Sequence, residues 1–202
     1  MNFLVVIVSY LLGSINFAYI TARIKGIDIS SEGSGNPGTS NVLRTLGKGS
    51  AAIVLLGDLF KGAIPIIFFY QDQYFLVYGL AAVLGHIYPV FYKFKGGKGV
   101  ATYLGVYVAT VLMNPYNSDL FNSETFQLLN IPALAFFYFV VFKTTRVSAI
   151  ASLATVLITV SLLIYINNEI SNVVVLVFLF VLILIKHSEN IKRLREGKEN
   201  KF

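Results

Sequence analysis

The sequence contains no cysteine and only two histidines, and these absences exclude several kinds of site. Without cysteine the chain has no disulfide and no thiolate nucleophile, and a structural zinc site is not expected. Charged residues are also scarce, at 13% against about a quarter in an ordinary soluble domain. Hydrophobic residues make up 56% of the chain and gather in runs such as VVVLVFLFVLILI at 173–185. This composition is typical of a protein that spans a membrane.

A helix that crosses a bilayer needs about 20 mostly apolar residues. Seven segments meet this requirement, which predicts an all-α bundle of seven transmembrane helices forming one membrane domain over 1–202. The first segment has no basic stretch before it and no small-residue cleavage site after it, so we expect a retained helix instead of a signal peptide. The predicted spans are 3–22, 51–70, 74–92, 98–115, 126–143, 147–166 and 172–186.

The basic residues predict the orientation of these spans. Of the 16 Lys and Arg residues, 15 follow the first, third, fifth or seventh span, whereas segments 71–73, 114–125 and 167–171 contain none. Because short cytoplasmic loops collect Lys and Arg, the N-terminus is expected outside and the C-terminus in the cytoplasm. The expected cytoplasmic segments are 23–50, 93–99, 144–147 and 187–202. They account for the net charge of +6, so no nucleic-acid partner is expected.

One basic residue, Lys61, lies inside the second predicted span, three residues after Asp58. An i,i+3 spacing puts both side chains on one helix face. Charges in hydrocarbon are costly and usually face the bundle and pair with each other. The spacing therefore predicts an internal ion pair, and leaves open whether the pair is structural or close to a functional site.

The stretch GSGNPGTSN at 33–41 fits the dinucleotide pattern G-x-G-x-x-G, but membrane helices on both sides leave no room for a parallel sheet. Glycines also let main-chain N–H groups approach an anion closely. A flexible polar loop is the alternative, because the same residues favour turns. The candidate phosphate-binding residues are Gly33, Ser34, Gly35, Asn36, Gly38, Thr39, Asn41 and Arg44.

Two further polar clusters are predicted on the same side of the membrane. GHIYPVFYKFKGGKGVAT at 85–102 carries His86, followed by a basic glycine loop with Gly96, Gly97 and Lys98. RVSAIAS at 146–152 and the tail KHSENIKRL at 186–194 form the third cluster. Its candidate residues are Arg146, Ser148, His187 and Asn190. For the tail, a basic helix lying on anionic membrane lipids is the alternative. Together the clusters could hold two anionic groups while an apolar chain enters between the helices.

These motifs, SEGSGNPGTSNVLR, GHIYPVFYKFKGGKGVAT and the pair RVSAIAS and KHSENIKRL, resemble those of the bacterial acyl-phosphate:glycerol-3-phosphate acyltransferase (PlsY) family. The sequence departs from the family pattern at Thr39-Ser40, where Ala-Thr is commoner, and at Lys186 and Ser188, where arginines are usual. The resemblance implies a seven-helix enzyme of the bacterial inner membrane with its active site at the cytoplasmic face, working without cofactor or metal. We expect it to function as a monomer.

The implied reaction moves an acyl group from acyl phosphate to sn-glycerol 3-phosphate, giving lysophosphatidic acid, the first step of bacterial phospholipid synthesis. The catalytic candidates are Ser34 and His86; His86 would orient or deprotonate the attacking hydroxyl, a role that a substrate phosphate could also take. Ser34 acting as a covalent nucleophile is an alternative. Competing classes are an organic-phosphate transporter, although no internal repeat is visible, and a lipid-binding scaffold.

Overall fold

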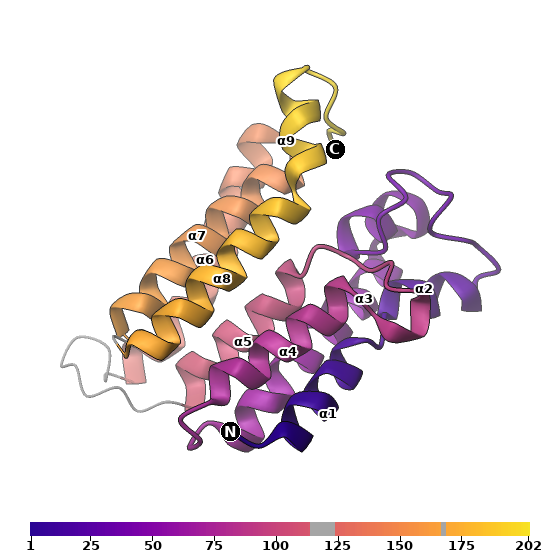
Figure 1. Cartoon of the computed structure of the whole chain (residues 1–202). Helices are drawn as coiled ribbons and strands as arrows, with labels where there is room; N and C mark the ends of the chain where they lie inside the picture. The colour runs from indigo at the N-terminus through magenta and orange to yellow at the C-terminus, as the bar shows by residue number, and fades with distance from the viewer. Residues whose placement is uncertain (114–123, 167–168) are drawn as a thin grey trace. The chain divides into compact units, whose positions relative to one another are not determined.

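The computed structural model describes residues 1–113, 124–166 and 169–202, and every regular element in these ranges is a helix. The predicted all-α class is therefore confirmed. The chain divides into two compact units, Met1–Thr110 and Val111–Phe202. The boundary falls inside helix α5 (Val100–Met113), and each unit is described by itself (Figure 1).

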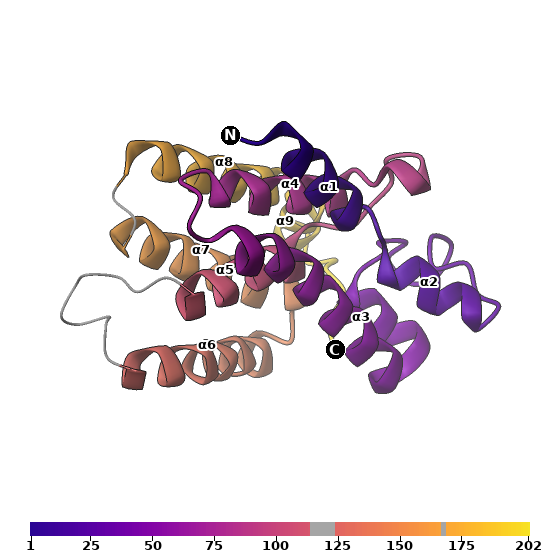
Figure 2. The same ribbon diagram turned by 90° about the horizontal axis from the view of Figure 1, so that it is seen from below.

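The first unit is built from four α-helices, a short 3₁₀-helix and most of α5. In chain order these are α1 (Phe3–Gly13), α2 (Phe17–Ile24), α3 (Thr39–Phe69), α4 (Phe75–Ile87) and η1 (Val90–Tyr92). Helix α1 lies along α4, and α3 packs against both α4 and α2 (Figure 2). The glycine loop at 33–38 leads into α3, and the glycine loop at 96–99 follows α4 and η1. Since α3 and α4 are in direct contact, both loops adjoin the same helix pair.

Asparagine caps determine where the first helices begin. Asn2 accepts a hydrogen bond from the Leu4 N–H, and Asn16 accepts from the N–H groups of the first turn of α2. The cap at Asn16 follows a break after Gly13, so α1 and α2 form one apolar stretch interrupted at 14–16. This break leaves backbone carbonyls without helical partners, and that of Ile15 instead accepts from a lysine of α3.

Helix α3 begins earlier than the predicted second span. It starts at Thr39, inside the segment expected to be a cytoplasmic loop, and bends at Gly47, where φ is +80° and ψ is 179°. The first turn is helical because the Gly38 carbonyl accepts hydrogen bonds from both Asn41 and Val42. Val42 is fully buried in a core with Ala18, so tertiary packing stabilises a segment whose composition favours turns.

Glycines bring the helices of the first unit into backbone contact. A Cβ placed on Gly13 would collide with the Ala82 carbonyl, and one on Gly85 with the Tyr10 carbonyl, so α1 and α4 approach each other reciprocally. A second pair of contacts joins α3 to α5, where Gly62 lies against the Thr102 carbonyl and Gly105 against that of Leu59. Small residues allow this close packing in membrane proteins, where lipid supplies little hydrophobic drive between helices.

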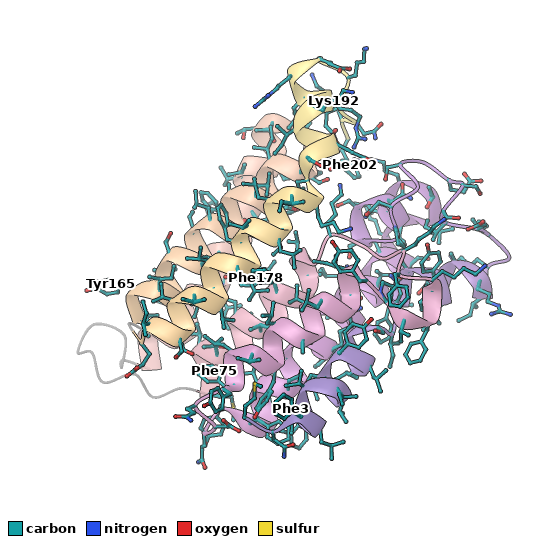
Figure 3. All side chains as sticks on the ribbon, in the orientation of Figure 1. Phe3, Phe75, Tyr165, Phe178, Lys192 and Phe202 are labelled. Atoms are coloured by element: carbon teal, nitrogen blue, oxygen red, sulfur yellow. The ribbon has the colours of Figure 1, made fainter. Side chains whose placement is uncertain are left out.

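The second unit contains α6 (Glu124–Thr145), α7 (Ser148–Ile166), α8 (Ile170–Lys186) and α9 (Ser188–Arg195). Helix α7 contacts both α6 and α8, and α9 is bent by 50° from α8 at His187. Phe178 lies midway along α8 and is half exposed (Figure 3). At the C-terminus, the Phe202 N–H donates to the Arg146 carbonyl and the Phe202 ring meets Phe142 edge-on.

Four helical stretches of the described residues are long and apolar enough to cross a bilayer: Phe3–Ile24, Thr39–Phe69, Phe75–Tyr92 and Ser148–Ile166. A fifth is present if α8 and α9 are one bent span. Val100–Met113 and Leu129–Thr145 are apolar but shorter, and residues 114–123 and 167–168 lie outside the description. Seven spans and the orientation of the termini therefore remain predictions. Large apolar side chains such as Phe60 and Phe68, 61% and 74% exposed, suit contact with lipid.

Candidate active site

The first glycine loop is organised by one buried side chain, Asn41. Its Oδ1 accepts from the Ser34 N–H at 2.8 Å, and its Nδ2 donates to the Glu32 carbonyl at 2.9 Å. Asn41 is 2% exposed, whereas Ser34 is exposed at the loop surface. Asn41 is one of the predicted phosphate-binding residues, and in this structure its amide closes the loop from the first turn of α3.

The glycines of this loop are required by its backbone. Gly33 and Gly35 have φ values of +58° and +68°, a region that other residues rarely adopt. Space is also limited: a Cβ on Gly33 would strike Asn41 Oδ1, and one on Gly35 would approach the Ser30 carbonyl oxygen to 2.9 Å. The loop therefore turns twice, and the Gly35 N–H is already used within it, donating to the Glu32 carbonyl at 2.9 Å.

The residues before the loop are ordered by Asp28. Its Oδ1 accepts from both the N–H and the hydroxyl of Ser30, at 3.0 and 2.7 Å. The Ser30 hydroxyl, followed by the Ser30 N–H, holds the pKa of the Asp28 carboxyl below its usual range. Asp28 therefore acts as the anchor of a turn that leads from α2 into Gly33.

The second glycine loop rests on His86. The Gly97 N–H donates to the His86 carbonyl at 3.2 Å, and a Cβ on Gly97 would collide with His86 Nε2. The same Cβ position lies 3.1 Å from the Pro37 carbonyl oxygen of the first loop. Gly97 therefore occupies the narrow seam where the two loops and the imidazole meet, and a side chain cannot fit there.

The other edge of the imidazole faces a buried polar cluster. His86 Nδ1 lies 3.1 Å from Thr102 Oγ1 and 3.5 Å from Asp58 Oδ1. Asp58 also pairs with Lys61 at 2.8 Å, which confirms the predicted internal ion pair. His86 is 3% exposed, so its ring lies beneath the loops.

The remaining site candidates of the first unit are distributed over the two loops and α3. Thr39 is the first residue of α3, directly after the N-cap Gly38, and its Oγ1 is buried without a hydrogen-bond partner among the described residues. Arg44 lies one turn further along α3 and is half buried. Lys98 is half buried between Gly97 and Gly99. Both cations and the first glycine loop therefore belong to the same unit.

The third cluster belongs to the second unit. Arg146 links α6 to α7 with φ +56° and is exposed, while Ser148 is the first residue of α7. The C-terminal residue reaches back to this linker, because the Phe202 N–H donates to the Arg146 carbonyl at 3.0 Å. The contact is made by the chain's last residue, which lies beyond the KHSENIKRL segment of the third motif.

His187 and Asn190 lie at the bend between α8 and α9, and both are buried. His187 Nδ1 lies 2.8 Å from the Ile183 carbonyl, which can only accept, so the proton resides on Nδ1. Asn190 Nδ2 donates to Glu199 Oε1 at 2.7 Å, and Arg193 Nε donates to Oε2 of the same carboxylate at 2.8 Å. Glu199 therefore holds the tail against α9.

Three residues of these clusters were not predicted as site residues. Asp58 and Thr102 contact His86, and Glu199 contacts Asn190. The i,i+3 pair with Lys61 was a signal for Asp58, although it does not reveal the partner on another helix. Thr102 is the last residue of the second motif, and no spacing or neighbouring residue in the sequence indicates its contact with His86. Glu199 lies in a charged tail whose composition is typical of a solvated segment.

The chemistry of these residues suits phosphate groups. The first unit combines a glycine loop at a helix N-terminus with a guanidinium, an ammonium and an imidazole, and no three His, Asp and Glu side chains of the described residues gather as a metal site would require. The fold and the site define an all-helical integral membrane protein with a glycine loop that leads into a long helix. The sequence matches the family model described as Glycerol-3-phosphate acyltransferase over residues 3–197. The chain belongs to that family, so the resemblance drawn from its motifs is confirmed.

Relatives and solved structures agree with this assignment. The glycerol-3-phosphate acyltransferases of Aquifex aeolicus and Geobacter sulfurreducens are 40% and 38% identical, over 98% and 96% of this chain and 97% and 94% of theirs. The chain also superposes on PlsY (YgiH), an integral membrane glycerol 3-phosphate acyltransferase, at 35% identity. Its glycerol 3-phosphate form gives a TM-score of 0.84 and its lysophosphatidic acid form 0.82, each covering 99% of this chain and 94% of the other.

Proposed function

We propose that this protein transfers a fatty acyl group from acyl phosphate to sn-glycerol 3-phosphate, giving lysophosphatidic acid and inorganic phosphate. Family membership supports the acceptor, and the related PlsY structures are described with glycerol 3-phosphate and lysophosphatidic acid. The observation that carries the donor assignment is the exposed glycine loop that Asn41 holds in place and that leads into the N-terminus of α3. The first N–H groups of α3, which have no partners within the helix, bind a phosphoryl group together with Arg44 without needing a carrier protein or a nucleotide pocket.

An acyl phosphate is already activated, so the enzyme's task is alignment and charge stabilisation. The acceptor hydroxyl oxygen bonds to the acyl carbonyl carbon, the bond from that carbon to the phosphate oxygen breaks, and the hydroxyl proton passes to a base. Orientation alone can supply about 7–11 kcal/mol of the barrier. Preorganised donors to the developing oxyanion can add about 2.7–4 kcal/mol each.

In this mechanism the first unit binds the donor. The main-chain N–H groups where the loop enters α3, with Ser34 and Thr39, cradle the acyl phosphate, while Arg44 and Lys98 neutralise phosphate charge. Asn41 contributes by holding the loop at Ser34, whose N–H it accepts. Direct attack on the donor makes an acylated Ser34 unnecessary. Single-turnover trapping with radiolabelled acyl phosphate tests this, because an acyl adduct on Ser34 would establish the covalent route instead.

Residues of the third motif are assigned to the acceptor. His187, Asn190 and Ser148 position glycerol 3-phosphate, and Arg146 adds positive charge. The buried amide of Asn190 and the Nδ1–H of His187 are held by protein groups, so their orientations are already determined before substrate arrives. The base is His86 or a phosphate of the substrates. Full activity of His86→Ala would remove His86 from the chemistry.

The assay that tests the function uses purified protein, palmitoyl phosphate and glycerol 3-phosphate. Release of inorganic phosphate that requires both substrates supports acyl transfer. Counterflow of glycerol 3-phosphate in liposomes without phosphate release would support a transporter instead. Neutralisation of two phosphates in one pocket also requires the two glycine loops to face the same side of the membrane. We propose that this is the cytoplasmic side of the bacterial inner membrane. We also propose that the enzyme has seven spans and works as a monomer.

The natural absence of cysteine makes the topology test direct. Single cysteines at the exposed positions Glu32 and Lys95 should be labelled from the cytoplasmic side, and one at exposed Glu169 from the opposite side. Labelling of Glu32→Cys and Lys95→Cys from opposite sides would rule out a common pocket.

A further inference from the structure

A buried ion pair lies directly behind the proposed active site. Asp58 Oδ1 and Lys61 Nζ are 2.8 Å apart, and both side chains are 2% exposed. Lys61 Nζ also donates to the Ile15 carbonyl at 2.7 Å, in the break between α1 and α2. A charge at this depth requires a partner. Lys61 therefore neutralises Asp58 and satisfies a carbonyl that the helix break leaves open.

Asp58 has a second contact, and its chemistry determines where the imidazole proton lies. Its Oδ1 is 3.5 Å from His86 Nδ1, and a carboxylate paired with an ammonium can only accept. A lone pair on Nδ1 would face that negative oxygen, whereas an N–H there would be attracted to it. Thr102 Oγ1, 3.1 Å from the same nitrogen, can accept as well. The geometry favours the proton on Nδ1.

The opposite ring nitrogen then carries the lone pair. Nε2 faces Gly97, whose Cα is so close that no Cβ fits between them. The carbonyl of Pro37, from the first loop, flanks the same glycine. The unprotonated nitrogen therefore lies against Gly97, the residue of the second loop that the Pro37 carbonyl of the first loop also flanks.

We propose that Asp58 is a positioning residue for this enzyme. Neutralised by Lys61, its carboxylate holds the His86 ring with the proton on Nδ1 and the Nε2 lone pair directed at the loop seam. Outer partners that fix a histidine's tautomer and orientation have this effect in other sites. The role depends on the proposed function, in which Nε2 orients or accepts the proton of the acceptor hydroxyl. Asp58 itself touches no substrate.

The ring can be observed directly because the chain has only two histidines. We would label histidine with ¹⁵N and record the imidazole nitrogens by solid-state NMR in lipid bilayers, using His187→Gln to assign His86. The parent protein should show a protonated Nδ1 and an unprotonated Nε2. The double variant Asp58→Asn/Lys61→Met, which removes both charges together, should lose this preference. A parent ring protonated on Nε2, or a ring unchanged in the double variant, would overturn the positioning role.

A milder substitution tests the same contact if the double variant fails to fold. Thr102→Val removes the hydroxyl near Nδ1, and Thr110→Val is its matched control on the same helix. Both threonines are fully buried, and Thr110 Oγ1 has no hydrogen-bond partner among the described residues. Thr102→Val should change the His86 signals and lower kcat, whereas Thr110→Val should do neither. Equal effects of the two substitutions would overturn the proposed contact.

Kinetics separate positioning from simple destabilisation. The Asp58→Asn/Lys61→Met variant should lower kcat by at least about tenfold, because general acid–base contributions of about 10²–10⁴-fold depend on the correct ring state. The KM for glycerol 3-phosphate should stay within about twofold, since ground-state binding is unaffected. In a His86→Ala background the same double substitution should have no further effect on kcat. A full additional loss there would mean that Asp58 acts by another route.

The positioning role and the proposed chemistry fail on different measurements. Full activity of His86→Ala would overturn the proposed chemistry at His86, while the NMR spectra would still decide whether Asp58 orients the ring. Loss of activity in His86→Ala, together with an unchanged ring in Asp58→Asn/Lys61→Met, would overturn the positioning role alone.

Discussion

Substituting Gly62 by alanine tests whether the close approach of α3 and α5 holds the first unit together. The added Cβ would overlap the Thr102 carbonyl oxygen and lie 2.8 Å from its carbon, whereas non-bonded carbons prefer about 3.5–4.0 Å. The obstacle is backbone, so no side chain can rotate away. The helices must separate by about 1 Å at this point, and overpacking of this kind costs about 1–3 kcal/mol.

The matched control is Gly49→Ala in the same helix. Nothing lies within 4 Å of a Cβ at Gly49, and its backbone is helical. Both substitutions gain about 0.8–1.0 kcal/mol of helix propensity, so the difference between them isolates the packing cost. That difference, about 1–3 kcal/mol, corresponds to about 2–12 °C in Tm for a chain of this size. Gly49→Ala is expected to melt at or slightly above the parent protein.

The assay is thermal unfolding of both purified variants in the same detergent and at the same scan rate. Gly62→Ala should melt below Gly49→Ala by the stated interval, and the reciprocal Gly105→Ala should behave like Gly62→Ala, because its Cβ would strike the Leu59 carbonyl. A Gly62→Ala variant as stable as Gly49→Ala would show that the two backbones are not in contact, and would refute the reasoning.

Three further predictions concern charges. Lys61→Met should lower stability by about 3–5 kcal/mol because it leaves Asp58 buried without its partner, whereas Lys48→Met, at an exposed position, should change Tm little. Arg44→Lys keeps the charge but removes the planar fork, so the KM for acyl phosphate should rise about 10- to 100-fold with the melting temperature unchanged; an unaltered KM would place the phosphate elsewhere. The Tyr78 hydroxyl, 2.6 Å from Asp72, lowers the pKa of that carboxyl. This stabilisation is present above about pH 4 and is lost as the pH falls through the lowered pKa, so Tyr78→Phe should make acid unfolding less steep, as followed by circular dichroism.

Much of this architecture follows from composition and spacing. The apolar runs predict helices because a bilayer leaves the backbone no other hydrogen-bond partners. The i,i+3 pair of Asp58 and Lys61 is equally local, since both side chains extend from one helix face. The contact of this pair with His86, in contrast, joins residues on different helices. His86 is reached only because α4 and α5 pack closely on α3, and the register between helices is not encoded in the spacing of either residue.

The start of α3 and the role of Asn41 were beyond sequence reasoning for a related cause. Glycine, serine and asparagine favour turns, yet Val42 is fully buried, and its packing stabilises the first turn of the helix. An asparagine amide can bind a ligand or the chain's own backbone with the same atoms. Only the structure reveals that the amide of Asn41 meets the Ser34 N–H and the Glu32 carbonyl.

The break after α1 links the packing of the first unit to its chemistry. Asn16 caps α2 and so ends the helical hydrogen-bonding of the residues before it, which leaves the Ile15 carbonyl available. Lys61 Nζ donates a hydrogen bond to that carbonyl, and the charge of Lys61 is balanced by Asp58. Asp58 in turn faces the ring of His86. An uninterrupted helix at 14–16 would withdraw the carbonyl and leave Lys61 with one partner fewer, so the irregular backbone here is a requirement of the ion pair that supports the proposed site.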